Sequence, residues 1–146
     1  MKLLVTRRMT QAAEHALSTR FETEILDRQD GLSVDEAARA LADYDAILPT
    51  LGDRFTAEAF QGRPRCRLLA NFGAGYNHID VAAAAAAGVA VTNTPDAVTE
   101  ATADIALTLI LMTARRAGEG ERLLRRGAWT GWQPTQLLGR HVTGCT

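Results

Sequence analysis

The sequence predicts an α/β fold in which a parallel sheet is wound with helices on both faces. Over residues 1–94, short apolar segments alternate with segments of helical character, which is the pattern of consecutive βαβ units. The 146 residues are enough for one domain with a substantial core. Apolar residues make up 47% and charged residues 23%, as is ordinary for a globular protein.

Five segments are expected to form the strands of this sheet. Each is short and rich in apolar or β-branched residues, and most are followed by a turn or a helix start. They cover residues 2–7, 21–27, 46–50, 67–72 and 89–94.

The helices between these strands have recognisable start and stop signals. Thr10 is a suitable N-cap for a helix over 11–20. Ser33 with Glu36 three residues later forms a capping box that starts the next helix. Residues 56–60 are expected to form one helical turn, and residues 80–88 a short helix that stops at Gly88.

The pattern changes after Pro95, where a long apolar helix is expected. Thr99 is a good N-cap, and residues 100–116 are apolar on nearly every face. Such a helix needs burial all round, either in the core or between two lobes. Beyond it we expect a short basic helix over 121–126, two packing tryptophans (Trp129 and Trp132) and no strand.

Charge and composition indicate a soluble cytoplasmic protein without a nucleic-acid or membrane partner. The net charge is −1, and the arginines of residues 115–140 lack interleaved aromatic residues for base stacking. Cys66 and Cys145 match no metal or disulfide pattern, and we expect no metal. The longest apolar run, residues 105–112, is well short of the roughly 20 residues that cross a bilayer.

A glycine turn at residues 73–78, Gly-Ala-Gly-Tyr-Asn-His, is the strongest functional signal. It begins like the dinucleotide fingerprint G-x-G-x-x-G, but His78 replaces the third glycine, and Asp96 lies beyond Pro95 instead of at a strand tip. Its backbone N–H groups also suit a smaller anion such as a carboxylate. A turn without a ligand is the third interpretation, and spacing alone leaves all three open.

Residues 71–116 resemble the D-isomer-specific 2-hydroxyacid dehydrogenases, which include glyoxylate/hydroxypyruvate reductase and phosphoglycerate dehydrogenase. The matching motifs are G-x-G-Y-[DN]-x-I-D at 73–80, A-x-x-x-G-V-x-V-T-N-T-P at 84–95 and T-E-A-T-A-D at 99–104. Residues 129–139 are similar to the family's W-x-G-W-x-P-x-x-L-L-G stretch, and residues 49–58 to an earlier loop. The resemblance therefore covers essentially the whole chain.

This resemblance implies two lobes and a set of site residues. Residues 1–98 would form a flavodoxin-like substrate domain, and residues 99–146 the incomplete beginning of a Rossmann, dinucleotide-binding domain that starts with the long helix. The substrate-binding residues carried over from the family are Gly73, Ala74 and Gly75, with Leu51 and Gly52 on a second loop; Ala74 and Thr102 would face the cofactor, NAD or NADP.

The resemblance also implies parts that these 146 residues do not contain. The family's G-x-G-x-x-G would follow Gly144, and its catalytic arginine, glutamate and histidine lie further on. His15, His78 and His141 match none of them, and we expect surface or packing roles for all three. We thus expect an N-terminal, inactive portion of an NAD(P)-dependent reductase of small 2-keto acids, homodimeric in full-length relatives. The alternatives are a non-catalytic module that binds small carboxylates or a partner protein, and a frameshift near Gly144.

Overall fold

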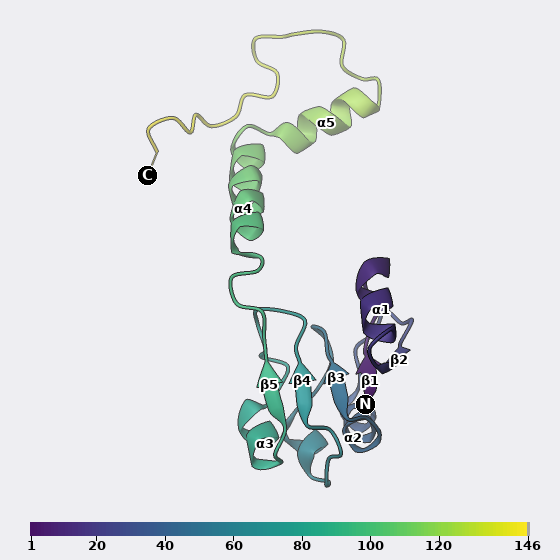
Figure 1. The fold of residues 1–146 in the computed structure, drawn as a ribbon. Coiled ribbons are helices and arrows are strands. Elements are labelled where there is room, and N and C mark those ends of the chain that lie inside the picture. The colour runs from purple at the N-terminus through teal and green to yellow at the C-terminus, as the bar shows by residue number, and fades with distance from the viewer. Residues whose placement is uncertain (146) are drawn as a thin grey trace. The chain divides into compact units, whose positions relative to one another are not determined.

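The computed structural model describes residues 1–145 and contains a parallel five-stranded sheet (Figure 1). The strand order is β2-β1-β3-β4-β5, which is the flavodoxin-like order, and it reverses between β1 and β3. The α/β prediction is confirmed, although each strand is shorter than its expected segment. The strands are β1 Lys2–Val5, β2 Glu22–Ile25, β3 Ala46–Leu48, β4 Leu68–Ala70 and β5 Ala90–Thr92.

The predicted helix starts of the first 97 residues are confirmed. The helices are α1 Gln11–Ser18, α2 Val34–Asp43, the 3-10 helix η1 Ala57–Phe60 and α3 Val81–Ala86. The Thr10 side chain accepts from the Ala13 amide, and Ser33 and Glu36 form the reciprocal capping box. Hydrogen bonds from Arg28 and from Ser33 lower the pKa of Glu36 to about 2.

Two apolar cores lie on the two faces of the sheet. Side chains alternate across a strand, so Leu4 packs into one core while Leu3 and Val5 pack into the other. The larger core joins the sheet to α2, η1 and α3, and the smaller one joins β1 and β3 to α1 through residues such as Leu17. One face of the sheet is therefore covered by α2, η1 and α3, and α1 covers the other face near β1, while Ala90 and Thr92 of β5 are exposed.

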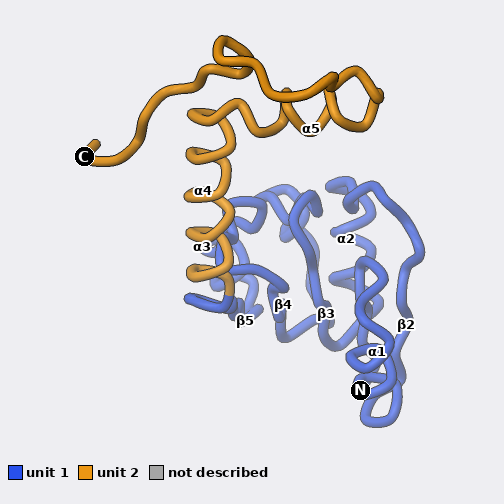
Figure 2. Tube along the Cα trace, turned by 90° about the horizontal axis from the view of Figure 1, so that it is seen from above, with its two compact units in different colours: residues 1–97 blue, residues 98–146 orange. Residues whose placement is uncertain are grey.

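The chain divides into two compact units, residues 1–97 and residues 98–146 (Figure 2). Within the described part of the second unit, α4 Thr99–Ala114 is followed by α5 Ala117–Arg125 and a strandless segment. This segment returns to the end of α4, where the Arg140 amide donates to the Ala114 carbonyl at 2.7 Å. A Cβ on Gly139 would lie 2.3 Å from that same oxygen, so the return requires glycine.

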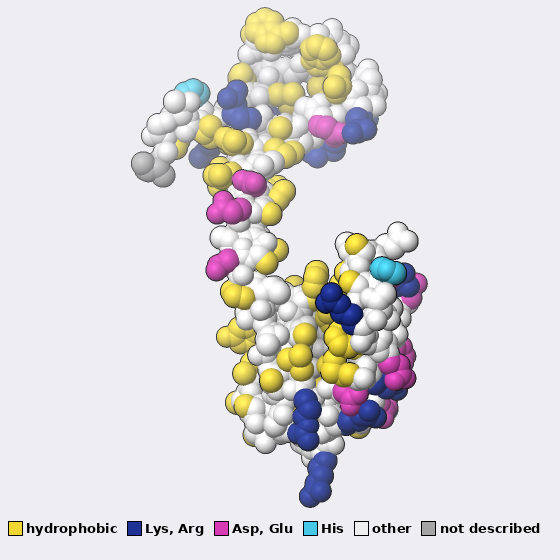
Figure 3. Space-filling view, viewed as in Figure 1, with side chains coloured by type: hydrophobic (Ala, Val, Ile, Leu, Met, Phe, Trp, Pro, Cys, Tyr) yellow, Lys and Arg dark blue, Asp and Glu magenta, His cyan; other side chains and the backbone are white. Residues whose placement is uncertain are grey.

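Two expectations for the second unit are wrong: the N-cap at Thr99 and the packing of the two tryptophans. Thr99 is the first residue of α4; the N-cap is Val98, and no side chain caps the helix. The helix buries no residue among those described, and Ile105, Leu107 and Ile110 are all more than half exposed. Apolar side chains are visible on the surface of this unit (Figure 3). Trp129 and Trp132 are exposed too, because the short segment that carries them offers no core against which they could pack.

No helix within residues 1–145 is long and apolar enough to cross a bilayer. At 16 residues α4 extends about 24 Å, which is less than the ~30 Å hydrocarbon thickness.

Candidate functional site

Two loops that follow neighbouring strands carry the predicted substrate residues. The loop after β3 contains Leu51 and Gly52, and the loop after β4 contains residues 73–78. The strands are parallel, so both loops leave the sheet at its carboxyl edge, where ligands of doubly wound sheets bind. The Phe72 amide donates to the Pro49 carbonyl at 2.9 Å, which ties the two loops together at their bases.

Three consecutive carbonyls of the glycine turn are hydrogen-bonded to protein donors. The Asn71 side-chain amide donates to the carbonyls of Gly73 and Gly75, each at 3.0 Å. The Asn93 side-chain amide donates to the Ala74 carbonyl at 2.8 Å, and the Thr94 backbone amide donates to Gly73 at 3.0 Å. The orientation of each peptide plane in the turn is thereby fixed from its carbonyl side.

The N–H groups of the same three peptides are left available to a ligand. In a trans peptide the carbonyl of one residue and the N–H of the next point in opposite directions. The amides of Ala74, Gly75 and Tyr76 therefore face away from the asparagine donors, and none of them donates a hydrogen bond to any atom of residues 1–145. A Cβ on Gly75 would meet nothing within 4 Å, so an anion can approach these amides closely.

The geometry after the turn argues against a pyrophosphate site. A dinucleotide-binding turn presents the free N-terminus of a helix to the phosphates. Here the Asp80 carboxylate caps α3 by accepting from the Ala83 amide at 2.9 Å, which places negative charge where a phosphate would lie. The half-buried His78 occupies the place of the third glycine. The arrangement argues against the dinucleotide interpretation and is compatible with a small anion.

A buried carboxylate, Asp53, holds the second loop. Its side chain is 1% exposed and accepts from the Leu32 and Thr50 amides, both at 2.8 Å, and from the Thr6 hydroxyl at 2.6 Å. Gly52 has a φ of 100°, a left-handed conformation that favours glycine. A Cβ on Gly31 would lie 1.9 Å from the Gly52 carbonyl oxygen, so the loop before α2 packs directly against this turn.

Arg7, at the end of β1, also supports the second loop. Its guanidinium donates to the Thr50 hydroxyl at 2.9 Å, to the Leu51 carbonyl at 3.2 Å and to the Gln29 carbonyl. These three bonds, one from each guanidinium nitrogen, make Arg7 a support of the loop and leave two of its five N–H groups unused by them.

His78 joins the two loops through its backbone and has a perturbed side chain. Its carbonyl accepts from the Phe55 amide at 3.0 Å, and the Phe55 carbonyl accepts from the Asp80 amide at 2.8 Å. Both ring nitrogens are buried without a hydrogen-bond partner among residues 1–145. Burial lowers the pKa of His78, and the charge of Asp53 partly opposes this effect.

The predicted site residues belong to both units of the chain. Gly73, Ala74 and Gly75 form one turn, and Leu51 and Gly52 lie on the adjacent loop. Thr102 belongs to α4 in the second unit, where its amide donates to the Val98 carbonyl at 2.9 Å. Sequence reasoning missed the supporting residues Asn71 and Asn93; an asparagine directly after each of two adjacent strands was the available signal.

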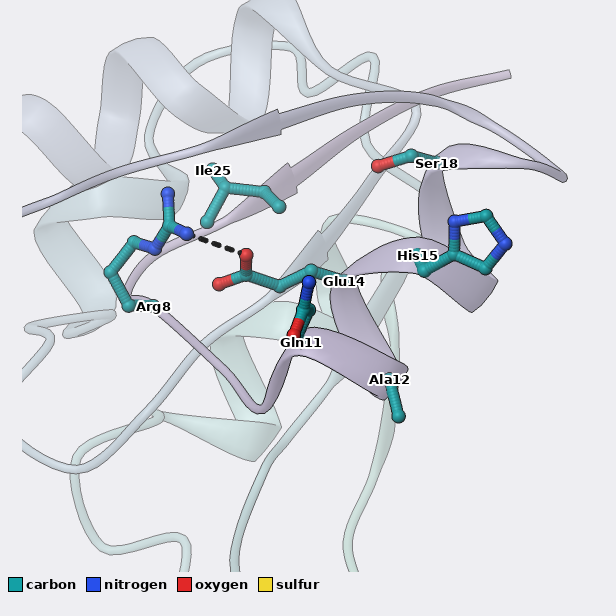
Figure 4. Close-up of a pocket in the computed structure, with 7 residues that line it drawn as sticks. All are labelled: Arg8, Gln11, Ala12, Glu14, His15, Ser18 and Ile25. Atoms are coloured by element: carbon teal, nitrogen blue, oxygen red, sulfur yellow. Dashed lines mark hydrogen bonds and ion pairs between the residues drawn. The ribbon is translucent and has the colours of Figure 1, made fainter.

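A hollow of about 650 Å³ lies beside α1, away from the predicted site residues (Figure 4). Its charged groups, Arg8 and Glu14, pair with each other at 2.8 Å, and Glu14 also accepts from the Met9 amide. The His15 ring lies away from this pair (Figure 4). Within residues 1–145 no group of three acidic, histidine or cysteine side chains is placed to hold a metal ion.

Comparison with known proteins identifies related sequences over nearly the whole chain. Residues 3–139 match the family described as D-isomer specific 2-hydroxyacid dehydrogenase, catalytic domain. A glyoxylate reductase of Thermococcus onnurineus (strain NA1) is 38% identical over 149 residues, covering 99% of this chain and 45% of the relative. A glycerate dehydrogenase of Hyphomicrobium methylovorum is 34% identical, again over 99% of this chain and 45% of the relative.

Solved structures show the same relationship. The NADPH-dependent glyoxylate/hydroxypyruvate reductase of Sinorhizobium meliloti, determined in complex with citrate, is 32% identical with a TM-score of 0.71. The similarity covers 91% of this chain and 42% of that protein. The chain thus spans slightly less than half the length of these relatives.

Proposed function

Because the chain belongs to the D-isomer specific 2-hydroxyacid dehydrogenase family, we propose that residues 1–98 are the substrate domain of an NAD(P)-dependent 2-keto acid reductase. The proposed substrates are small acids such as glyoxylate or hydroxypyruvate. Residues 99–146 would begin the dinucleotide-binding domain. The observation that carries the proposal is the glycine turn: the protein engages the carbonyls of Gly73, Ala74 and Gly75, while the N–H groups of the same three peptides have no partner within residues 1–145.

The proposed role of this turn is to bind the carboxylate shared by all these substrates. Carboxylate oxygens accept from several N–H groups at once, and hydrogen bonds to an ionised group are roughly twice as strong as neutral ones. The amides of Ala74 and Gly75 supply two of these donors, and Gly73 allows close approach. Leu51 and Gly52 would line the other side of the substrate.

The hydride and the proton require groups beyond these 146 residues. In this family the nicotinamide cofactor supplies the hydride, while the protein orients the keto acid and supplies a proton donor. Ala74 and Thr102 are the residues proposed to face the cofactor. The glycine turn does not fit the cofactor's pyrophosphate, since the helix after it is already capped by Asp80. We propose that the 146-residue polypeptide has no dehydrogenase activity by itself.

An alternative role is a module that associates with other protein without catalysis. The exposed apolar residues of α4 favour this role, since contiguous apolar surface of this kind usually marks an interface. In the complete protein the same surface is compatible with a homodimer. Light scattering of the purified chain tests whether it associates with itself. A stable monomer would contradict such association.

Titration of D-glycerate into the ¹⁵N-labelled chain tests the carboxylate site. We expect saturable shifts of the Ala74, Gly75 and Tyr76 amides with a dissociation constant on the order of 1 mM, the upper end of the usual range of KM values. The control is glycerol, which lacks the carboxylate and should move none of them. Equal shifts with glycerol, or no saturable shift with D-glycerate, would refute the proposal.

Turnover of NADH with glyoxylate by the 146-residue chain tests the proposed inactivity. Oxidation of NADH at the rate of a protein-free blank is expected. A rate above that blank that copurifies with the chain would show that these residues carry the chemistry themselves.

A further inference from the structure

The glycine turn is oriented by two asparagine side chains that come from different strands. Asn71 directly follows β4 and is 2% exposed, whereas Asn93 directly follows β5 and is exposed. Between them they donate to the carbonyls of Gly73, Ala74 and Gly75. Neither side chain can reach the face of the turn that carries the free N–H groups, because each is bonded to the opposite side of the peptide planes.

Each asparagine controls different N–H groups. The peptide between Ala74 and Gly75 has its carbonyl bonded to Asn93, so Asn93 determines where the Gly75 N–H points. Asn71 holds the peptides on either side: it orients the Tyr76 N–H through the Gly75 carbonyl, and it orients the Ala74 N–H through the Gly73 carbonyl together with the Thr94 amide. The orientation of all three N–H groups therefore depends on both asparagine side chains.

Asn71 has an unusual hydrogen-bond inventory for a residue that serves stability alone. Both of its contacts use the side-chain NH₂, whereas the buried Oδ1 has no partner among residues 1–145. An unsatisfied buried acceptor is destabilising. The unpaired Oδ1 of Asn71 thus lowers stability while its NH₂ group orients the turn. Such a local cost is expected where a residue is selected for the geometry of a binding site.

We propose that Asn71 and Asn93 are positioning residues that aim the N–H groups of Ala74, Gly75 and Tyr76 at the substrate carboxylate. This inference rests on the proposed function and extends it from the turn itself to the residues behind it. Asn71 and Asn93 do not touch the substrate, so their loss should weaken carboxylate binding without removing any ligand contact.

The test compares D-glycerate binding by the 146-residue wild type, Asn93→Ala and Asn77→Ala. Asn93 is exposed, so its replacement leaves the folded core intact. Asn77 lies in the same turn, is exposed and makes no side-chain hydrogen bond within residues 1–145, which makes it a matched control. We expect Asn93→Ala to raise the dissociation constant about tenfold or more, corresponding to the loss of one hydrogen bond to a charged ligand. Asn77→Ala should change it less than twofold.

The pattern of amide shifts provides a readout that a purely structural role would not produce. In Asn93→Ala the D-glycerate-induced shift of Gly75 should fall more than that of Ala74, while the melting temperature stays that of the wild type. The reciprocal variant Asn71→Asp keeps the shape but removes the donors, and should reduce the Ala74 and Tyr76 shifts. If Asn71→Asp does not fold, the Asn93→Ala result alone tests the positioning role.

The outcomes separate this inference from the proposed function. If the wild type binds D-glycerate and Asn93→Ala binds it equally well with the same Gly75 shift, positioning is refuted while the carboxylate site stands. If the wild type does not bind D-glycerate, the proposed function fails and this inference fails with it.

Discussion

Replacing Gly31 by alanine should disturb the second loop of the site from outside it. The new Cβ would lie 1.9 Å from the Gly52 oxygen, 2.2 Å from its carbonyl carbon and 2.7 Å from the Asp53 nitrogen. All three are backbone atoms, so no side-chain rotation relieves the contact. To reach a separation of about 3.0 Å, the peptide between Gly52 and Asp53 must move by at least about 1.1 Å relative to residue 31.

A displacement of this size breaks the hydrogen bonds of Asp53. Its bonds to the Leu32 and Thr50 amides are 2.8 Å long, and an added ångström takes either one beyond hydrogen-bond range. Over-packing costs about 1–3 kcal/mol, and losing one bond to a charged group costs about 1.5–3 kcal/mol. We therefore expect Gly31→Ala to lower the free energy of unfolding of the first unit by about 3 kcal/mol or more.

The measurement must report on the first unit alone, because both tryptophans lie in the second. Urea titration followed through the amide resonances of Leu41, Ile47 and Leu69, all buried in the first unit, meets this need. The control is Gly62→Ala, where a Cβ meets nothing within 4 Å. A Gly31→Ala stability within about 0.5 kcal/mol of this control would refute the packing argument.

Three further predictions concern other parts of the chain. The pKa of His78 is lowered by burial, so the unfolded chain binds the proton more tightly and stability should fall as pH drops below about 6.5; His78→Asn should flatten this dependence, and an unchanged slope would contradict it. The pKa of Glu36 is about 2 in the folded chain and about 4.3 in the unfolded chain. Its ionised carboxylate therefore stabilises the fold above about pH 4.3, and this stabilisation is lost as the pH falls toward 2. The melting temperature of Glu36→Gln should fall less over this pH range than that of the wild type. Gly139→Ala should release residues 137–140 from α4, seen as faster amide exchange at Arg140, whereas Gly118→Ala, with ordinary contacts, should not.

The local features of the fold could be predicted because their causes lie within a few residues. The Thr10 cap, the capping box of Ser33 and Glu36 and the stop at Gly88, which has a φ of 77°, each depend on neighbours along the chain. The alternation of apolar strands and helices similarly predicted a parallel sheet. Thr99 was predicted as the N-cap because it is a threonine before an apolar helix. In the structure the helix begins one residue earlier than expected, with Thr99 as its first residue and Val98 as the N-cap.

The candidate site could be predicted only in part. The glycine turn, with Gly73 and Gly75, was visible in the sequence, but three ligands remained compatible with it. The Asp80 cap on α3 and the engaged carbonyls of the turn favour a small anion over a dinucleotide. Both features depend on the direction of hydrogen bonds, which residue spacing does not specify.

The sequence by itself determined the fold class, the family and the position of the glycine turn, because these follow from local propensity and from motifs that are contiguous in the chain. Only the tertiary structure decided which residues support the site. Gly31 meets Gly52, and Asn93 meets Ala74, across 21 and 19 positions of sequence, respectively. Such contacts arise from the order of the strands in the sheet and the close packing of their loops, and no pattern along the chain encodes them directly.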